Sequence, residues 1–318
     1  MAVLNIRTAK REGARLVIGI AGVSGSGKTR TALELAYGLT NFNASKIGFI
    51  DTENKRGSLY ADCLKNEKGE VQEFLIGDLE PPFSPARYAQ AIKEFEAAGV
   101  EVIVIDSVTH EYEGIGGVLE LREPLPGKSG KRDNHAKSEH KKFMNVMLQS
   151  APHVICCVRA REKTRIEKQN GQTVYVQEGI KPVQEKNFMF EMTASMMMHN
   201  GGKLRQVDKS GDGTEAIFGN AGEFYDGYLT AQHGKMLRDW VDGGVQIDPR
   251  VEALRSKLKA FTEQGVAALE EKWGMLNDKQ KDAVGKEYYA TLLESAREYD
   301  SLAKPENDDA SDLNEALA

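Results

Sequence analysis

Residues 22–29 read Gly22-Val23-Ser24-Gly25-Ser26-Gly27-Lys28-Thr29 and match the pattern G-x-x-x-x-G-K-[ST] in full. The apolar stretch 16–21 before them predicts a buried strand, and the stretch 28–39 after them predicts a helix. Glycines let such a turn fold back so that backbone N–H groups face an anion, and a helix N-terminus adds partial positive charge. The stretch therefore predicts a phosphate-binding loop. A glycine-rich turn that matches by chance is the alternative, and the strand–helix context disfavours it.

The residues that close this loop have the chemistry to bind a nucleotide and a metal ion. Lys28 is expected to reach the β- and γ-phosphates of ATP, and Thr29 is expected to hold Mg²⁺. Arg30, the next residue, joins the expected nucleotide-binding set. ATP and Mg²⁺ are therefore the cofactors that the sequence predicts.

A second carboxylate fits the same chemistry. Asp106 follows the four apolar residues 102–105, which is the Walker B pattern of a central strand that delivers a carboxylate beside Mg²⁺. The alternative is a strand-end aspartate that caps the next turn. Because the phosphate loop requires such a partner, Asp106 is expected to be a metal ligand and a catalytic residue.

Apolar runs alternate with helical patterns through the first two thirds of the chain. Strands are expected at 16–21, 47–50, 71–76, 102–105 and 153–158, with helices at 28–39, 85–98 and 136–148. Shorter strands at one side of the sheet are expected at 173–177, 193–198 and 203–207. This alternation predicts an α/β fold with a mostly parallel central sheet and helices on both faces.

Glycines cluster at 211–227 and at 243–244, and Pro249 follows, so a boundary is expected near Asp248. The core domain then spans 1–248. Apolar residues at helical spacing predict a small module of two or three helices over 249–304. Residues 305–318 hold five acids and no base, which predicts an acidic disordered tail.

The overall composition limits the classes of protein and the cell compartments that fit this chain. The net charge is -6, and the chain has three cysteines, of which Cys156 and Cys157 are neighbours in an apolar run without metal-ligand spacing. No apolar stretch is long enough to cross a membrane, and the first residues are mixed and charged. A cytoplasmic protein is expected. An acidic chain binds nucleic acid only through local basic patches. Whether this chain can bind DNA therefore depends on where its basic residues lie, not on its net charge.

Two further segments carry a family resemblance. Phe49-Ile50-Asp51-Thr52-Glu53 followed by Tyr60, and Ile105-Asp106-Ser107-Val108, resemble the RecA recombinases. The resemblance implies a RecA-like P-loop NTPase core in which Glu53 is the catalytic glutamate and Tyr60 stacks on adenine. The alternatives are a solvated loop acid for Glu53 and a helix-packing aromatic for Tyr60.

Over residues 15–220 the chain is most similar to short bacteriophage RecA-like or AAA-type recombination ATPases of the single-strand annealing kind. Beside the phosphate loop, the stretches that carry this resemblance are 106–109, 158–163, 179–182 and 188–191. The chain departs from RecA at Val158-Arg159, where RecA has Asn-Gln, so Arg159 is a candidate phosphate sensor. Lys209 is the candidate for a contact with the γ-phosphate of a neighbouring subunit, and ordinary surface charge is the equal alternative.

Two basic segments are expected to leave the carboxyl edge of the sheet as loops. Residues 122–142 contain seven lysines or arginines against three acids, and residues 159–168 contain five against two. These positions correspond to the DNA-binding loops of RecA-like proteins, and a solvated charged face is the alternative. Phe143 and Tyr175 are the aromatic residues that could stack on bases. The DNA-binding candidates are Lys131, Arg132, Lys137, Lys163, Arg165 and Lys168.

The leading functional hypothesis is a Mg-ATP-dependent recombination ATPase that acts as an oligomer, ring or filament, on single-stranded DNA. A single-strand binding protein is a further possible partner. The first alternative is a RecA-fold motor, either a hexameric helicase or a DNA-packaging ATPase. The second is a slow nucleotide switch that binds protein partners, which Glu53 disfavours because a switch needs no catalytic base.

Overall fold

The computed structural model describes residues 15–124, 132–169, 172–211, 213–243 and 249–303. Lys131 and the predicted acidic tail lie outside these residues. The chain divides into two compact units, Met1–Gln246 and Ile247–Ala318. Within the described part of the chain, no helix is long and apolar enough to cross a membrane.

The first unit is built on one sheet with the strand order β3-β2-β4-β5-β1-β7-β8-β9. The six strands from β3 to β7 run parallel, and β8 and β9 add antiparallel pairs at one edge. Their bounds are β1 Val17–Gly22, β2 Ile47–Asp51, β3 Leu75–Asp78, β4 Val102–Asp106, β5 His153–Gln169, β7 Ala194–His199, β8 Leu204–Lys209 and β9 Phe224–Asp226. Every residue of β1, β2 and β4 is buried, as expected for central parallel strands covered on both faces.

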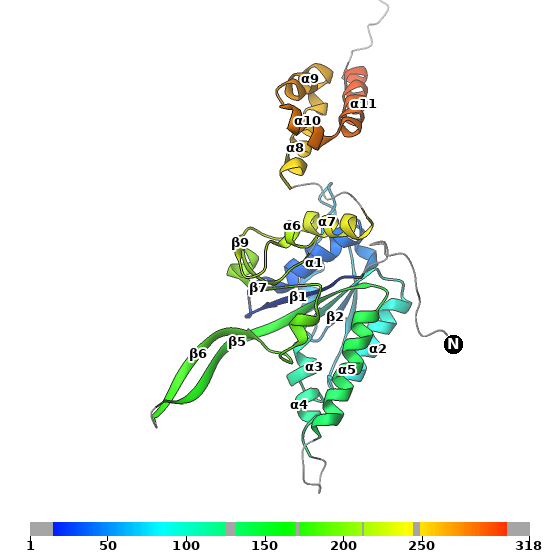
Figure 1. Cartoon of the computed structure of the whole chain (residues 1–318). Coiled ribbons are helices and arrows are strands. Elements are labelled where there is room, and N and C mark those ends of the chain that lie inside the picture. Colours follow the sequence, from blue (N-terminus) through cyan, green and yellow to red (C-terminus); the bar gives the residue numbers. More distant parts are fainter. Residues whose placement is uncertain (1–14, 125–131, 170–171, 212, 244–248, 304–318) are drawn as a thin grey trace, which may run out of the picture. The chain divides into compact units, whose positions relative to one another are not determined.

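Helices cover both faces of this sheet (Figure 1). One face packs against α1 (Lys28–Leu39), α6 (Glu215–Phe218) and α7 (Ala231–Val241), and the other packs against α2 (Pro85–Ala97) and α5 (Asp133–Gln149). Two short helices, α3 (Thr109–Glu113) and α4 (Val118–Leu121), follow β4. Strand β5 lies between β1 and β4, which carry the phosphate loop and Asp106. This is the predicted RecA-like P-loop architecture.

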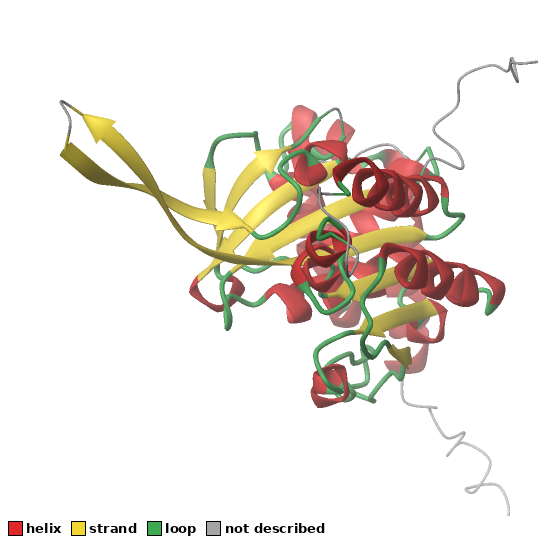
Figure 2. Ribbon diagram, turned by 90° about the horizontal axis from the view of Figure 1, so that it is seen from below, coloured by secondary structure: helices red, strands yellow, loops and turns green. Residues whose placement is uncertain are grey.

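The segment that was predicted to be a basic loop at 159–168 is instead the outer half of β5. It pairs antiparallel with β6 (Gln172–Pro182), from Ala160↔Pro182 to Gln169↔Gln172. We call residues 160–169 and 172–182 the arm, a two-stranded ribbon that projects from the sheet (Figure 2). The predicted strand at 173–177 lies in this arm and pairs only with β5, not with the side of the sheet. The pattern resembled a loop because a ribbon solvated on both faces has no buried apolar row.

The other predicted basic loop is largely helical. From Asp133 onward it forms α5, so Lys137 lies on an exposed helix face and Phe143 is buried in the core. Because its ring is buried, Phe143 cannot stack on bases.

Strand β3 also differs from the prediction. It begins at Leu75 rather than at Val71, which forms only an isolated bridge with Lys65.

The second unit has its own small core. Its elements are α8 (Pro249–Ala260), α9 (Val266–Gly274), α10 (Asp278–Val284) and α11 (Lys286–Ala303), with a short 3-10 turn, η5 (Thr262–Gln264). Between residues 249 and 303 the module thus holds four α-helices, where the sequence pattern predicted two or three. Its described core consists of the buried apolar residues Leu258, Leu269, Val284, Leu292 and Ala296.

Candidate active site

The phosphate loop follows β1 directly and ends where α1 begins at Lys28. The N-cap residue Gly27 has φ 89° and offers no side-chain cap, so the first N–H groups of α1 are left for a ligand. A Cβ at Gly27 would lie 2.6 Å from the backbone of Gly201 and Gly202. The turn η4 (Asn200–Gly202) therefore packs tightly on the loop, and only glycine fits at this position.

Lys28 is held inside the loop. Its Nζ donates to the carbonyl oxygens of Gly22 and Val23, both at 2.9 Å. The hydroxyl of Ser26 is buried and has no hydrogen-bond partner. An orphaned hydroxyl, an ammonium group held only by carbonyls and an uncapped helix N-terminus together fit a bound phosphate chain.

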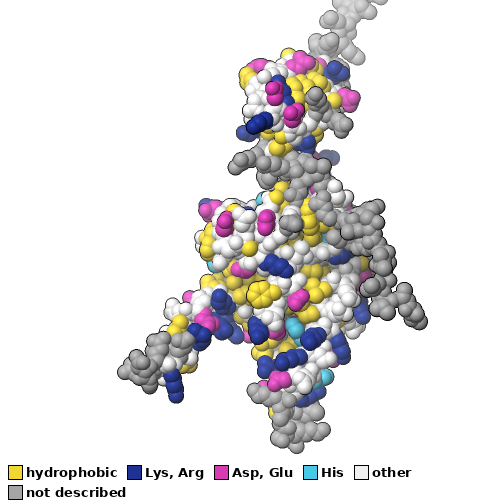
Figure 3. Space-filling view, in the orientation of Figure 1, with side chains coloured by type: hydrophobic (Ala, Val, Ile, Leu, Met, Phe, Trp, Pro, Cys, Tyr) yellow, Lys and Arg dark blue, Asp and Glu magenta, His cyan; other side chains and the backbone are white. Residues whose placement is uncertain are grey.

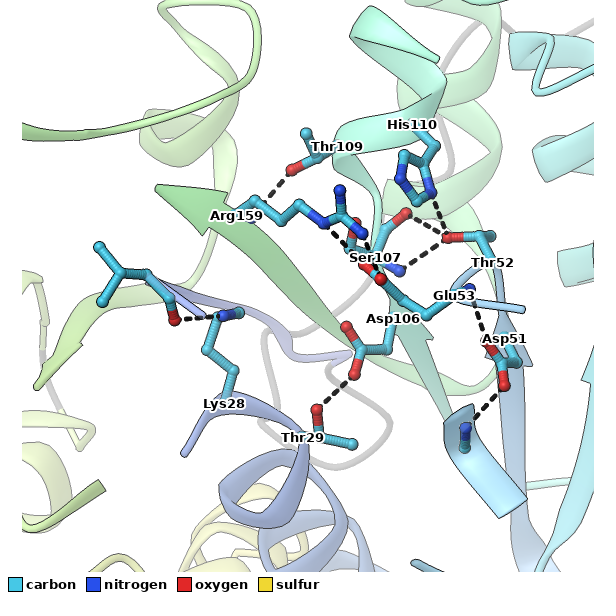
Figure 4. A network of polar contacts seen from close by, with 12 residues as sticks. Lys28, Thr29, Asp51, Thr52, Glu53, Asp106, Ser107, Thr109, His110 and Arg159 are labelled. Atoms are coloured by element: carbon cyan, nitrogen blue, oxygen red, sulfur yellow. Dashed lines mark hydrogen bonds and ion pairs between the residues drawn. The ribbon is translucent and has the colours of Figure 1, made fainter. Parts of the chain in front are cut away.

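Thr29 and Asp106 meet as predicted for a magnesium site (Figure 4). The Thr29 hydroxyl donates to Oδ2 of Asp106 at 2.5 Å. Burial raises the pKa of the Asp106 carboxyl to about 6, although the hydrogen bond from Thr29 opposes this. In the described residues no group of three or more His, Cys, Asp or Glu side chains could hold a metal. Thr29 and Asp106 thus fit Mg²⁺ that takes its other ligands from phosphates and water.

Glu53 lies two residues beyond Asp51, which is the partner of Asp106 across β2 and β4. Asp51 fixes the turn that carries Glu53: its Oδ1 accepts from the N–H of Glu53 at 2.6 Å, and its Oδ2 accepts from the N–H of Gly57 at 2.7 Å. The turn continues through Asn54 and Lys55, both with positive φ. The carboxylate that was predicted to be catalytic is thus placed beside the phosphate loop.

Arg159, the predicted phosphate sensor, contacts Glu53 directly. Its Nε donates to Oε1 of Glu53 at 2.7 Å, and its Nη2 donates to Oε2, so the pair is bidentate (Figure 4). Burial raises the pKa of Glu53, but the hydrogen bonds and the charge of Arg159 outweigh burial and leave it below its ordinary value. Both carboxylate oxygens of Glu53 therefore accept hydrogen bonds from the same guanidinium group.

Sequence reasoning gave no role to four residues that brace this site. The hydroxyl of Thr52 donates to the carbonyl oxygen of Ser107 at 3.0 Å, accepts from its N–H at 2.9 Å, and lies 2.8 Å from Nδ1 of His110. The N–H of Arg159 donates to the hydroxyl of Thr109 at 2.9 Å. The available signal was that polar residues follow both strand ends, at 52 and at 107, 109 and 110.

The other predicted site residues lie apart from these contacts. Arg30 is exposed and forms an ion pair with Glu34 at 2.6 Å, one turn along α1. Tyr60 ends the turn η2 (Arg56–Tyr60), is half-buried and packs against the core. This contact resembles the alternative of a packing aromatic that was weighed against stacking on adenine. Lys209 ends β8 and donates to the carbonyl oxygen of Phe190 at 2.7 Å. Their predicted roles toward adenine and a neighbouring subunit stay predictions.

Comparison with known proteins agrees with this geometry. A family model described as an AAA domain matches residues 14–206, more than half of the chain. The chain belongs to this AAA-domain family. Among solved structures it is similar to a KaiC-like protein from the hyperthermophilic archaeon Pyrococcus horikoshii OT3, at 15% identity and a TM-score of 0.37, over 63% of this chain and 80% of that one. A comparison with curated proteins finds no match.

Proposed function

We propose that this AAA-domain protein hydrolyses Mg-ATP while bound to single-stranded DNA, as a cytoplasmic oligomer of the phage recombination and annealing type. The observation that carries the proposal is the course of β5. One strand leads from the catalytic residues, where Arg159 contacts Glu53, into the exposed basic arm. A ligand bound along the arm is therefore connected to the catalytic carboxylate by a single strand.

The roles of the catalytic residues follow from their placement. Lys28 and the N–H groups of the loop bind the phosphate chain. Thr29 and Asp106 would hold the Mg²⁺ that accompanies the phosphates. Bound Mg²⁺ would supply positive charge against the charge that develops on the phosphates. Glu53 lies where a carboxylate can orient and deprotonate a water molecule, since Asp51 fixes the turn that carries it.

The arm carries a row of cations on one face. Side chains alternate along a strand, so Arg159, Arg161, Lys163 and Arg165 point to the same side of β5. We call these four residues the cation row. Lys168, which sequence reasoning grouped with Lys163 and Arg165, belongs to the opposite face. Figure 3 shows dark blue side chains along the arm and over the region of α3 to α5.

A second basic surface lies on α5. A groove of about 560 Å³ is lined by residues that share an exposed stripe of this helix: Asn134, Lys137, Ser138, Lys141, Lys142 and Asn145. All six side chains can donate hydrogen bonds, as phosphate oxygens require. The predicted candidate Lys137 thus belongs to a helix surface rather than to a loop, and Arg132 is the residue just before this helix.

Aromatic stacking has one exposed candidate on the arm. Tyr175 pairs with Ile166 across the two strands, and both side chains are exposed. An exposed ring on a ribbon is suited to stack on an unpaired base, whereas paired bases offer no free face. This favours single-stranded over double-stranded DNA. The oligomeric state, the partner protein and the choice of recombination over a motor rest on the family resemblance.

The test is a salt series of oligonucleotide binding, measured by fluorescence anisotropy. We expect Arg161→Gln, Lys163→Gln and Arg165→Gln together to flatten the slope of log affinity against log salt by roughly 2, since each lost contact with a single strand removes about 0.7. Lys65→Gln, Lys68→Gln and Lys93→Gln together remove the same charge from exposed positions elsewhere and should keep the wild-type slope. Equal slopes for both triple variants would exclude the arm as the DNA site.

A further inference from the structure

The cation row on the arm is neutralised in the free protein. Arg159 pairs with Glu53, Arg161 lies 3.2 Å from Glu113, and Lys163 and Arg165 lie 3.2 and 3.5 Å from Glu178. Each cation of the row therefore faces a carboxylate. The three carboxylates belong to different parts of the fold: Glu178 belongs to the arm, Glu113 ends α3, and Glu53 is the catalytic residue of the site.

Successive cations of the row are about 6.8 Å apart, because a strand rises about 3.4 Å per residue. The row thus runs for about 20 Å from the catalytic site into the arm. A polyanion that follows the row competes for every cation in turn. It also brings phosphates close to Glu113 and Glu178, and like charges at that distance repel.

At Arg159, the inner end of the cation row, only the side chain has to move for the contact with Glu53 to break. The backbone of Arg159 is fixed on both sides: its N–H donates to Thr109, and its carbonyl oxygen accepts from the N–H of Val183 at 2.8 Å. Its side chain is 45% exposed, whereas that of Glu53 is only 15% exposed. The guanidinium group can therefore swing toward solvent, while the carboxylate stays in the site.

We propose that the Arg159–Glu53 pair restrains the catalytic carboxylate, and that a single DNA strand on the cation row releases it by drawing Arg159 outward. This inference rests on the proposed function and adds its regulation. While the pair is closed, each oxygen of Glu53 accepts a hydrogen bond from Arg159, and the guanidinium group lowers the pKa of the carboxyl, so Glu53 is a weaker base toward a water molecule. Once it opens, Glu53 is a stronger base in an unchanged position.

Arg159→Gln tests the restraint. Without DNA we expect this variant to hydrolyse ATP roughly fivefold faster than wild type, because partly exposed ion pairs contribute modest free energies. Added oligo-dT should stimulate it little further. Arg159→Lys keeps the charge without the bidentate geometry, so its rate of hydrolysis without DNA should lie between those of wild type and Arg159→Gln. Arg297→Gln, the same change at an exposed position of the second unit, should match wild type.

A pH profile separates the restraint from a purely structural role. The acidic limb of the rate should move to higher pH in Arg159→Gln, since Glu53 no longer has its pKa lowered by the guanidinium group. Wild type with oligo-dT should show the same move. A stable but misfolded variant would not reproduce the profile of the DNA-bound wild type.

The outcomes are distinct. If Arg159→Gln is slower than wild type under all conditions, Arg159 acts on the phosphates and the restraint is wrong. If its rate and stimulation equal those of wild type, the pair has no influence and the inference fails, while DNA binding by the arm stands. If oligo-dT fails to bind wild type, the proposed function and the release step fail together, whatever the variant does.

Discussion

The hydroxyl of Thr29 and the carboxylate of Asp106 are in hydrogen-bond contact at 2.5 Å, although 77 residues separate them in the chain. This contact exists because β5 spaces β1 and β4 by one strand, so that the start of α1 faces the end of β4. The proposed Mg²⁺ site rests on this contact.

Asp106→Asn should keep the contact with Thr29, since an amide oxygen also accepts, but it removes the negative charge. We expect nucleotide to bind and Mg-dependent hydrolysis to fall roughly 100-fold or more. Chelation of Mg²⁺ from wild type should abolish hydrolysis, and added Mg²⁺ should restore it. Asp62→Asn, at an exposed position, is the matched control. Normal turnover by Asp106→Asn would remove Asp106 from the metal site.

Lys28→Ala should lose most nucleotide binding and hydrolysis. Its ammonium group is held 2.9 Å from the carbonyl oxygens of Gly22 and Val23 and is nearly buried, so alanine leaves the phosphate charge uncompensated in a partly dry site. Binding of a fluorescent ATP analogue and release of phosphate measure the two effects. Wild-type values for both would show that the loop does not bind phosphate.

Glu53→Gln should bind nucleotide and hydrolyse it roughly 100-fold more slowly, because the amide keeps the shape and loses the basic oxygen. Glu67→Gln, at an exposed position, is a control for loss of one carboxylate. Should Glu53→Gln turn over as fast as wild type while Asp106→Asn is inactive, the general base lies elsewhere.

Gly27→Ala should destabilise the first unit more than Gly25→Ala does. Both residues have positive φ, but a Cβ at Gly27 would lie 2.6 Å from the backbone of Gly201 and Gly202, whereas a Cβ at Gly25 meets nothing within 4 Å. The extra cost should be about 1–3 kcal/mol, the range for overpacking. Thermal unfolding without nucleotide measures the difference. Equal melting temperatures would mean that the turn η4 does not press on the loop.

The buried pair of Glu111 and His140 predicts a pH-dependent stability. Nδ1 of His140 lies 3.0 Å from Oε1 of Glu111. Burial lowers the pKa of His140, but Glu111 outweighs burial and raises it above its ordinary value. A raised histidine pKa stabilises the fold fully below the unfolded pKa of about 6.5, and this stabilisation is lost as pH rises through the folded value.

The melting temperature of wild type should therefore fall by ~2 °C or more as pH rises above 6.5 through the folded pKa of His140. His140→Gln should be less stable than wild type at low pH and should lack this fall. Glu185 also raises the pKa of His140, so Glu185→Gln should show a smaller fall. A variant His140→Gln with the wild-type pH dependence would assign the transition to another group.

The sequence predicted the parts of this protein that depend on local pattern. The phosphate loop, α1 and the strands that end near Glu53 and Asp106 each carry their own signal, because buried parallel strands are short apolar runs and the loop needs glycine. The pairing of Arg159 with Glu53 carries none, since the two residues are 106 positions apart and meet only once β5 lies beside β4.

The arm was not predicted for a related reason. Its first strand alternates charged residues with Thr164 and Ile166, and none of the side chains described between 161 and 181 is buried. Pairing with β6 supplies the backbone hydrogen bonds, and that pairing is a long-range property that a window of sequence does not contain. Predicted loop residues therefore became a strand with two chemically different faces.

The most direct test of the whole account is the steady-state rate of ATP hydrolysis by wild type in Mg²⁺ at low salt, with and without oligo-dT. The triple variant of Arg161, Lys163 and Arg165 is measured beside it. The account predicts hydrolysis by both proteins, stimulation of wild type by oligo-dT, and little stimulation of the variant. A wild-type rate that is the same with and without bound oligo-dT would contradict it.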